Sequence, residues 1–226
     1  MRLLLVAATE KEIAPLLSVM KFCGDIRPNL KWYQYNEHDI DVLITGVGMV
    51  ATAVWVSGTV SARDYSSAIN AGICGSFDRN LPLGEVVRVE TDCMPELGAE
   101  DDTKFISIFD MDLLNKSDFP FQNGMLHGSD TAAFGSLLQL KAVSGITVNR
   151  VHGNEHSIAE VAQRLNPQTE SMEGAAFYYA CAVAGVSAIQ IRAISNYVEK
   201  RNRSAWKISD AVKNLNAELL KYLEQR

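Results

Sequence analysis

Basic side chains, paired cysteines and long apolar runs are scarce in this sequence, and each shortage excludes a class of protein. Lys and Arg together number 21 against 27 Asp and Glu, which gives a net charge of −6. A nucleic-acid-binding domain needs a basic face to hold phosphates, so we expect no nucleic-acid partner. The cysteines form no C-x-x-C pair and have no histidine at metal-ligand spacing; they are Cys23, Cys74, Cys93 and Cys181. We therefore expect reduced thiols, no disulfide framework and no metal site.

The apolar runs are too short or too interrupted to predict a membrane protein. Residues 1–8 are followed at once by the charged residues 10–12, which suits a buried first strand better than a signal peptide. Residues 174–191 carry several polar side chains and are expected to divide into a buried helix and a buried strand. The 226 residues, 47% of them hydrophobic, suffice for a sizeable core. We expect one cytoplasmic domain over residues 1–226 with no membrane partner.

Strand-like and helix-like patterns alternate along the chain, which predicts an α/β fold: three α/β/α layers around a central mixed β-sheet. A polar stretch over residues 91–123 is expected to form a long excursion near the mouth of a site. Ligands of such sheets bind beyond the carboxyl ends of the strands, here just after residues 8, 45, 70, 148 and 194. The expected strands are 2–7, 32–35, 40–45, 67–70, 85–90, 145–148 and 187–194, and the expected helices are 9–20, 49–63, 131–141, 157–165, 174–184 and 208–223.

Five segments at these strand ends are candidates for chemistry, and each also has a structural interpretation. Glu12 lies three residues after Thr9, which is the spacing of a capping box, but it is also a carboxylate available to take a proton from water. Residues 46–51 (GVGMVA) form a weak dinucleotide-binding pattern, for which close helix–strand packing is the favoured explanation. Residues 70–76 (NAGICGS) are expected to form a glycine-rich loop that a ligand can approach.

The other two candidates lie in the last third of the chain. Glu173 is expected at a helix N-terminus, where the helix dipole favours a carboxylate whether or not it binds a ligand. Asn196 follows an apolar strand at the expected edge of the site and is alternatively a plain turn residue.

Taken in order, these segments resemble the methylthioadenosine/S-adenosylhomocysteine nucleosidases of the purine/uridine phosphorylase superfamily. The resemblance spans nearly the whole chain, and residues 169–176 and 191–196 carry its most specific motifs. Residues 147–153, 193–198 and 203–207 resemble one branch more closely, the futalosine hydrolases, which release hypoxanthine from futalosine in an alternative menaquinone pathway. The resemblance therefore implies a cofactor-free nucleoside hydrolase, commonly a dimer or larger homo-oligomer.

The resemblance also implies a role for each matching residue. Glu12 would hold and deprotonate the attacking water, and Arg192 would help to orient Glu12 or that water. Glu173 would accept hydrogen bonds from the ribose hydroxyls, beside Met172 packed on the sugar. Asn196 would face the base. Val151, His152 and Gly75 would line the substrate pocket.

Three departures from the family pattern are visible. Met49 stands where the family has Lys, Ile73 stands where the adenine nucleosidases have a Ser, and Asn196 stands where they have Asp. A protonated Asp suits a 6-aminopurine, which offers N7 as an acceptor and N6 as a donor. A 6-oxopurine offers N7 and O6, both acceptors, which suit the N–H donors of an Asn amide. Asn196 therefore favours a 6-oxopurine.

Two alternatives stay open within the superfamily: an adenine nucleosidase and a purine nucleoside phosphorylase. The phosphorylases hold phosphate with a Gly-Asp-Pro segment and an Arg before the glycine loop, whereas this chain has Ala8-Thr9-Glu10 and Asn70. Water is thus the favoured nucleophile. A third alternative is a dinucleotide-binding module built on residues 46–51. Near residue 200, Arg201, Arg203, Trp206 and Lys207 are equally well explained as contacts for a charged 5′-substituent or as a solvated approach to the last helix.

The change of Asn196 to Asp tests the base preference. Activity on 6-oxopurine nucleosides is expected to fall more than activity on adenine nucleosides, because an ionised Asp faces two acceptors and leaves its charge unpaired. Steady-state rates on inosine-type and adenosine-type substrates measure the ratio, and an equal loss on both would refute the assignment.

Overall fold

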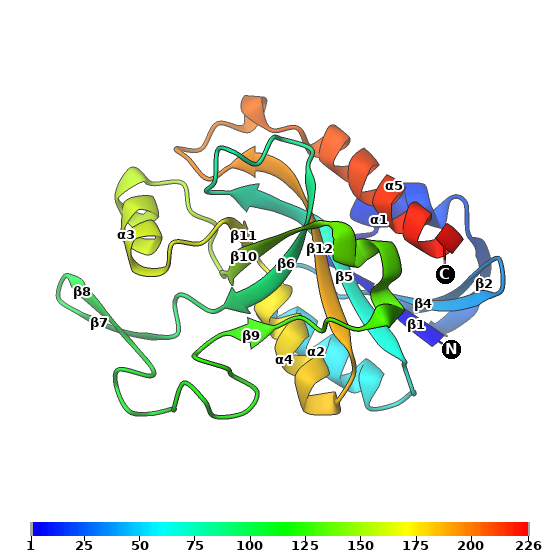
Figure 1. The fold of residues 1–226 in the computed structure, drawn as a ribbon, viewed down its shortest axis with the longest axis horizontal. Helices are drawn as coiled ribbons and strands as arrows, with labels where there is room; N and C mark the ends of the chain where they lie inside the picture. The colour runs from blue at the N-terminus through cyan, green and yellow to red at the C-terminus, as the bar shows by residue number, and fades with distance from the viewer. Residues whose placement is uncertain (1, 226) are drawn as a thin grey trace.

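A single mixed β-sheet organises the chain, as the computed structural model of residues 2–225 shows (Figure 1). Within those residues the strand order is β11-β10-β6-β12-β5-β1-β4-β3-β2, with β9 paired to β6. The strands are β1 (Arg2–Ala7), β2 (Lys21–Arg27), β3 (Leu30–Tyr35), β4 (His38–Ile44), β5 (Ser67–Ser76), β6 (Val86–Cys93), β9 (Leu126–His127), β10 (Lys141–Thr147), β11 (Thr169–Ser171) and β12 (Ala188–Tyr197).

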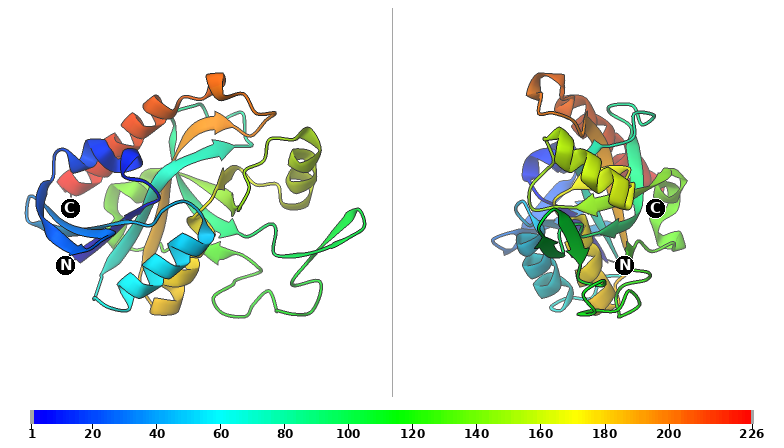
Figure 2. Two further views of the ribbon diagram at one scale, coloured as in Figure 1. Left: turned by 180° about the vertical axis from the view of Figure 1, so that it is seen from behind. Right: turned by 90° about the vertical axis from the view of Figure 1, so that its left-hand side faces the viewer.

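Helices cover both faces of this sheet, so the predicted three-layer α/β fold is confirmed (Figures 1 and 2). Along β1, Leu3 and Leu5 pack under α1 and α5, while Leu4 and Val6 pack under α2 and α4, because successive side chains of a strand point to opposite faces. The helices are α1 (Glu10–Leu17), α2 (Met49–Val60), α3 (Glu155–Leu165), α4 (Gly174–Ala184) and α5 (Ile208–Gln225), with 3-10 segments η1 (Ala132–Gln139) and η2 (Arg203–Ala205).

Four central strands, β4, β1, β5 and β12, run parallel, so their carboxyl ends meet at one edge of the sheet. The short strand β11 closes over that edge, since it pairs with β10 on one side and antiparallel with the end of β5 on the other. The sheet therefore curls around the carboxyl end of β5 instead of staying open.

Several element boundaries differ from the sequence-based expectation. Residues 70–76 are not a loop but the second half of β5, which stays straight because β12 pairs with it along its length. The expected helix over residues 131–141 is a 3-10 segment kinked at Gly135, and Lys141 already begins β10. Strands β2 and β11 were not expected. Nor was the hairpin of β7 (Gly98–Asp101) and β8 (Lys104–Ser107), which projects from the body of the molecule (Figure 2).

Two expectations from the composition concerned reduced thiols and the lack of a membrane-spanning segment. All four thiols are free, and burial raises the pKa of Cys74 and of Cys93 to about 12, which makes these thiols poor nucleophiles. Within residues 2–225, the structure contains no helix with the length and apolar character needed to cross a bilayer. Residues 1 and 226, the ends of the expected single domain, lie outside the described residues.

Candidate active site

A cavity of about 350 Å³ opens at the carboxyl ends of β1, β5 and β12. Its walls come from the start of α1, the ends of β5, β11 and β12, the segment before α4 and the start of α5. Six of the eight residues singled out in the sequence line it, namely Glu12, Gly75, Val151, Met172, Glu173 and Asn196. Arg192 and His152 do not; Arg192 lies behind it, and His152 lines a smaller adjoining cavity of about 60 Å³.

Glu12 combines the two interpretations that the sequence left open. Its Oε2 accepts hydrogen bonds from the backbone N–H and the hydroxyl of Thr9, each at 2.9 Å, as in a capping box. Its Oε1 accepts from the backbone N–H of Ile73 at 3.2 Å, which ties α1 to β5. A side chain at Gly72 would begin 2.9 Å from that same oxygen, so it would displace the carboxylate. The carboxylate is thus held at the cavity wall by its cap.

The glycines of residues 46–51 serve the site in a way that the sequence did not indicate. Gly46 and Gly48 adopt φ angles of +83° and +101°, and a Cβ on Gly48 would meet no atom within 4 Å. The expected role in close helix–strand packing is therefore wrong, since these glycines are needed for their left-handed backbone. That backbone directs the N–H of Gly48 to Oε1 of Glu173 at 3.0 Å.

Glu173 is the N-cap residue of α4, but its side chain turns to Gly48 and not to its own helix. Burial raises the pKa of Glu173, Arg192 and the Gly48 N–H lower it, and the charge of Glu12 raises it further. Glu12 and Glu173 therefore share the cavity, and burial makes Glu173 harder to ionise than an ordinary glutamate.

Arg192 is 1% exposed and lies behind Gly72. Its guanidinium donates to the backbone carbonyl of Asn70 at 3.1 Å and to the Asn70 side chain. In the described part of the chain no ion pair within 4.0 Å links it to Glu12, so the expected direct orientation of Glu12 has no contact to support it. Its positive charge instead favours the ionised form of Glu173.

Asn196 is aimed by an irregularity in β12. The pairing with β5 shifts register between Ile194 and Asn196, so Ser195 is the extra residue of a bulge. In a regular strand Asn196 would share a face with Ile194, whereas the bulge puts it on the face of Gly75, which lines the cavity. Its Oδ1 accepts from Ser195 at 2.8 Å and its Nδ2 donates to the Tyr197 carbonyl at 3.0 Å. One amide N–H remains for a ligand, not the two expected from the sequence.

Glu170 is a lining residue to which the sequence analysis gave no role. It is 4% exposed, it lies on the three-residue strand β11, and it lines both the main cavity and the adjoining one. Its Oε1 accepts from the backbone N–H of His152 at 3.0 Å, and its Oε2 contacts Nδ1 of the same residue. The only signal in the sequence was a charged residue inside a buried segment.

Below the cavity, Asp92 supports the start of α4. It accepts from Thr147 at 2.9 Å and from Gln190 at 3.1 Å, and the Thr147 hydroxyl accepts from the N–H of Ala175 at 2.7 Å. Burial raises the pKa of Asp92 to about 6. A Cβ on Gly174 would lie 2.2 Å from Asp92, so α4 packs here without a side chain. This network fixes the backbone that carries Glu173.

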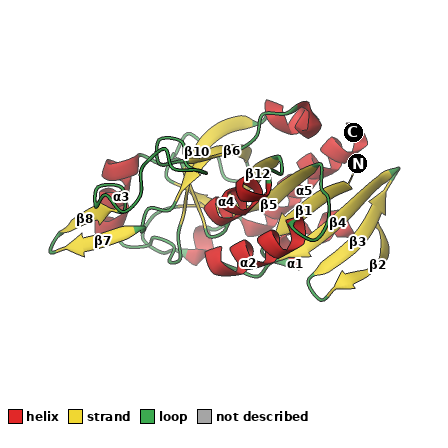
Figure 3. Cartoon of the chain, turned by 90° about the horizontal axis from the view of Figure 1, so that it is seen from below, coloured by secondary structure: helices red, strands yellow, loops and turns green. Residues whose placement is uncertain are grey.

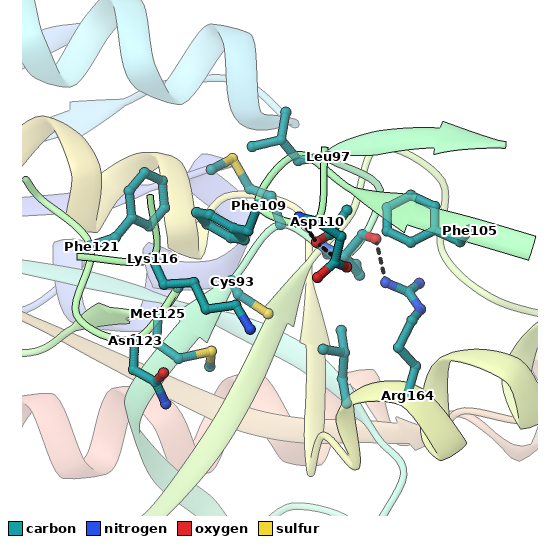
Figure 4. A pocket seen from close by; sticks show the side chains of 15 residues that line it. Cys93, Leu97, Phe105, Phe109, Asp110, Lys116, Phe121, Asn123, Met125 and Arg164 are labelled. Atoms are coloured by element: carbon teal, nitrogen blue, oxygen red, sulfur yellow. Dashed lines mark hydrogen bonds between the residues drawn. The ribbon is translucent and has the colours of Figure 1, made fainter. Parts of the chain in front are cut away.

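The long polar stretch does not lie at the mouth of this cavity, so that expectation is wrong. Its first three residues belong to β6, and no residue of 91–123 lines the cavity. Figure 4 shows the separate cavity of about 250 Å³ that it surrounds, with Phe109 and Phe121 on one side and Arg164 of α3 on the other. Within residues 2–225, no cluster of three or more His, Cys, Asp or Glu is arranged to hold a metal ion.

The loop after β12 carries the four residues singled out near residue 200, and one of them lines the main cavity. Trp206 lines it, and Arg201 stacks on the Trp206 ring at 5.5 Å and lines the adjoining cavity. Arg203 lies 6.0 Å from the same ring, and the Lys207 backbone N–H donates to Ser195.

Comparisons with known proteins identify the family to which this chain is similar. The sequence profile described as the phosphorylase superfamily matches residues 2–224. A futalosine hydrolase of Thermus thermophilus is 28% identical over 176 residues, which cover 76% of this chain and 76% of that protein.

Among solved structures, the native futalosine hydrolase of Helicobacter pylori superposes with a TM-score of 0.79 at 15% identity, over 99% of this chain and 97% of that one. A 5′-methylthioadenosine/S-adenosylhomocysteine nucleosidase of Colwellia psychrerythraea in complex with adenine superposes with a TM-score of 0.80 at 21% identity, over 100% of this chain and 95% of the other. At these identities the structural matches establish the fold.

Neutralising the two carboxylates is expected to change stability in opposite directions at pH 7. Glu12→Gln should lower the free energy of unfolding by about 1–2 kcal/mol, because three hydrogen bonds lose their charged acceptor. Glu173→Gln should raise it, because the ionised Glu173 is costly to bury.

The pH dependence of the second effect has a definite sign. The folded-state pKa of Glu173 is raised, so its contribution to stability is present at low pH and is lost as the pH rises through that pKa. The advantage of Glu173→Gln should therefore shrink as the pH falls to about 4, near the ordinary pKa of Glu. Urea unfolding at both pH values measures it; equal destabilisation by both variants at each pH would contradict this assignment.

Proposed function

The chain belongs to the phosphorylase superfamily, and we propose that within it the chain is a nucleoside hydrolase that cleaves futalosine with water and releases hypoxanthine. The observation that carries the proposal is the meeting of Glu12, Glu173 and Asn196, from three distant parts of the chain, around one cavity. The curated relatives named futalosine hydrolase support the choice of substrate.

Each of the three groups has a chemical task in this proposal. Cleavage of an N-glycosidic bond builds positive charge on the ribose, and an anionic Glu173 beside the sugar hydroxyls stabilises that charge. Glu12 keeps a water molecule at the cavity wall and takes its proton as the water attacks. Asn196 donates its free N–H to the departing base, and because an amide is a poor acid, the base leaves with negative charge.

Water is favoured over phosphate by the charge of the cavity. Glu12 and Glu173 both line it, whereas Arg192 lies behind it and is engaged by Asn70. Phosphate entering such a cavity would face three carboxylates, Glu170 included, with Lys11 but no arginine among the lining residues to meet it. An adenine nucleosidase is the second candidate, because solved methylthioadenosine/S-adenosylhomocysteine nucleosidases share this fold.

Base release in phosphate-free buffer tests the function. The protein is incubated with futalosine, inosine and methylthioadenosine, and the released base is identified by chromatography. Futalosine is expected to react fastest and to give hypoxanthine. Glu12→Gln should lower the rate by about 10²–10⁴-fold, as loss of a general base does.

Glu10→Gln is the matched control, because Glu10 begins the same helix and its side chain is 61% exposed. It should leave the rate unchanged. A requirement for phosphate would identify a phosphorylase instead, and faster release of adenine would identify an adenine nucleosidase.

We also propose that the chain forms a homo-oligomer and that it acts in the cytoplasm without a membrane or nucleic-acid partner. Val50 and Val54 are exposed on one face of α2, and Tyr179 and Val183 on one face of α4, in each case four residues apart. The two helices pack side by side (Figure 3), so these side chains form one apolar surface, which a second copy would cover.

The mass in solution tests this assembly. Sedimentation velocity is expected to give at least twice the 24.8 kDa of one chain, and Val54→Glu should shift the mass toward that of a single chain. Lys221→Glu, on α5 at the other face of the sheet, is the control and should leave the mass unchanged. A wild-type protein of 24.8 kDa would contradict the assembly.

A further inference from the structure

Gly75 lies between two polar residues of the neighbouring strands. In the pairing of β5 with β11 its partner is Glu170, and in the pairing of β5 with β12 its partner is Asn196. Residues directly opposite each other in a sheet point to the same face. Glu170 and Asn196 thus flank a residue that has no side chain, and all three line both the main and the adjoining cavity.

The space above Gly75 is kept open by the glycine. A Cβ there would lie 3.2 Å from Nδ2 of Asn196 and 3.0 Å from Val198. Neighbouring strands are about 4.8 Å apart, so the two flanking strands lie roughly 10 Å apart. That span suits a purine with one hydrogen bond at its N7 side and one at its N1 side.

Glu170 has hydrogen-bonding capacity to spare. An ionised carboxylate offers about four acceptor sites, and His152 occupies one on each oxygen. No Lys or Arg of residues 2–225 forms an ion pair with it, and His152 is its one ion-pair partner there. A buried carboxylate with open acceptor sites gains most from a ligand that brings a donor.

We propose that Glu170 is a specificity-determining residue that accepts a hydrogen bond from N1–H of a 6-oxopurine, while Asn196 donates to the acceptor edge of the same base. This inference rests on the proposed function. A 6-oxopurine carries a hydrogen on N1, whereas N1 of a 6-aminopurine is an acceptor and would face the carboxylate without a proton between them. His152 is a positioning residue, since its N–H groups hold the carboxylate in place.

The kinetic signature follows from when this hydrogen bond is made. It forms in the bound substrate and persists in the transition state, so its loss raises KM more than it lowers kcat. In Glu170→Gln, the amide turns its oxygen to N1–H or its NH₂ to an unprotonated N1, and discrimination between the two bases is lost.

Glu170→Gln is compared with wild type on futalosine and on the same nucleoside carrying adenine. KM for futalosine should rise about tenfold with a smaller change in kcat, the difference expected between a hydrogen bond to a charged group and one to a neutral amide. The preference for hypoxanthine, as a ratio of kcat/KM values, should fall at least tenfold. Glu37→Gln, in the exposed turn between β3 and β4, is the matched control and should change neither.

Inhibition of the wild-type protein by free bases gives a second measurement that does not depend on folding of a variant. Hypoxanthine should inhibit more strongly than adenine and more strongly than 1-methylhypoxanthine, which lacks the N1–H. Equal inhibition by hypoxanthine and 1-methylhypoxanthine, or an unchanged KM and base preference in Glu170→Gln, would overturn the role of Glu170. Failure of the wild type to release hypoxanthine would instead overturn the proposed function.

Discussion

The carboxylate of Glu12 joins two segments that are far apart in the sequence, and the arrangement of the cavity depends on that junction. One oxygen caps α1 through Thr9, and the other accepts from Ile73 in the second half of β5. The same oxygen lies against Gly72, where a side chain would displace it. The first helix is thereby fixed against the central strand, with a negative charge at the cavity wall.

The opposite wall is fixed in a similar way by backbone donors. Gly48 donates to Glu173, and the buried Asp92 holds the start of α4 through Thr147. The ionised form of Glu173 is thus favoured by Arg192 behind it and by the N–H of Gly48, against the cost of its burial. A cavity lined in this manner attracts developing positive charge on a bound sugar and repels anions.

The sequence predicted much of this because several signals are local. The capping box of Thr9 and Glu12, the apolar run of β1 and the carboxylate at the start of α4 each span a few residues, and all three are present. The features that the sequence did not predict depend on pairing between distant segments. Strand β11 has three residues and no periodicity, and its partners lie about 25 and 95 positions away in the sequence.

The role of Glu170 was missed for the same reason, since nothing near it in the sequence places it beside Gly75. The glycines at residues 46 and 48 were visible, but whether a glycine serves close packing or a left-handed backbone is decided by φ, which the sequence does not contain.

The side of the sheet to which Asn196 points depends on the bulge at Ser195 as well as on the residue type. If Ser195 paired regularly with Gly75 instead of bulging out, the amide of Asn196 would point to the opposite side of the sheet. Relatives that differ in length at this point are therefore not comparable column by column. An alignment that places the extra residue elsewhere would pair the amide of Asn196 with the wrong neighbour on β5.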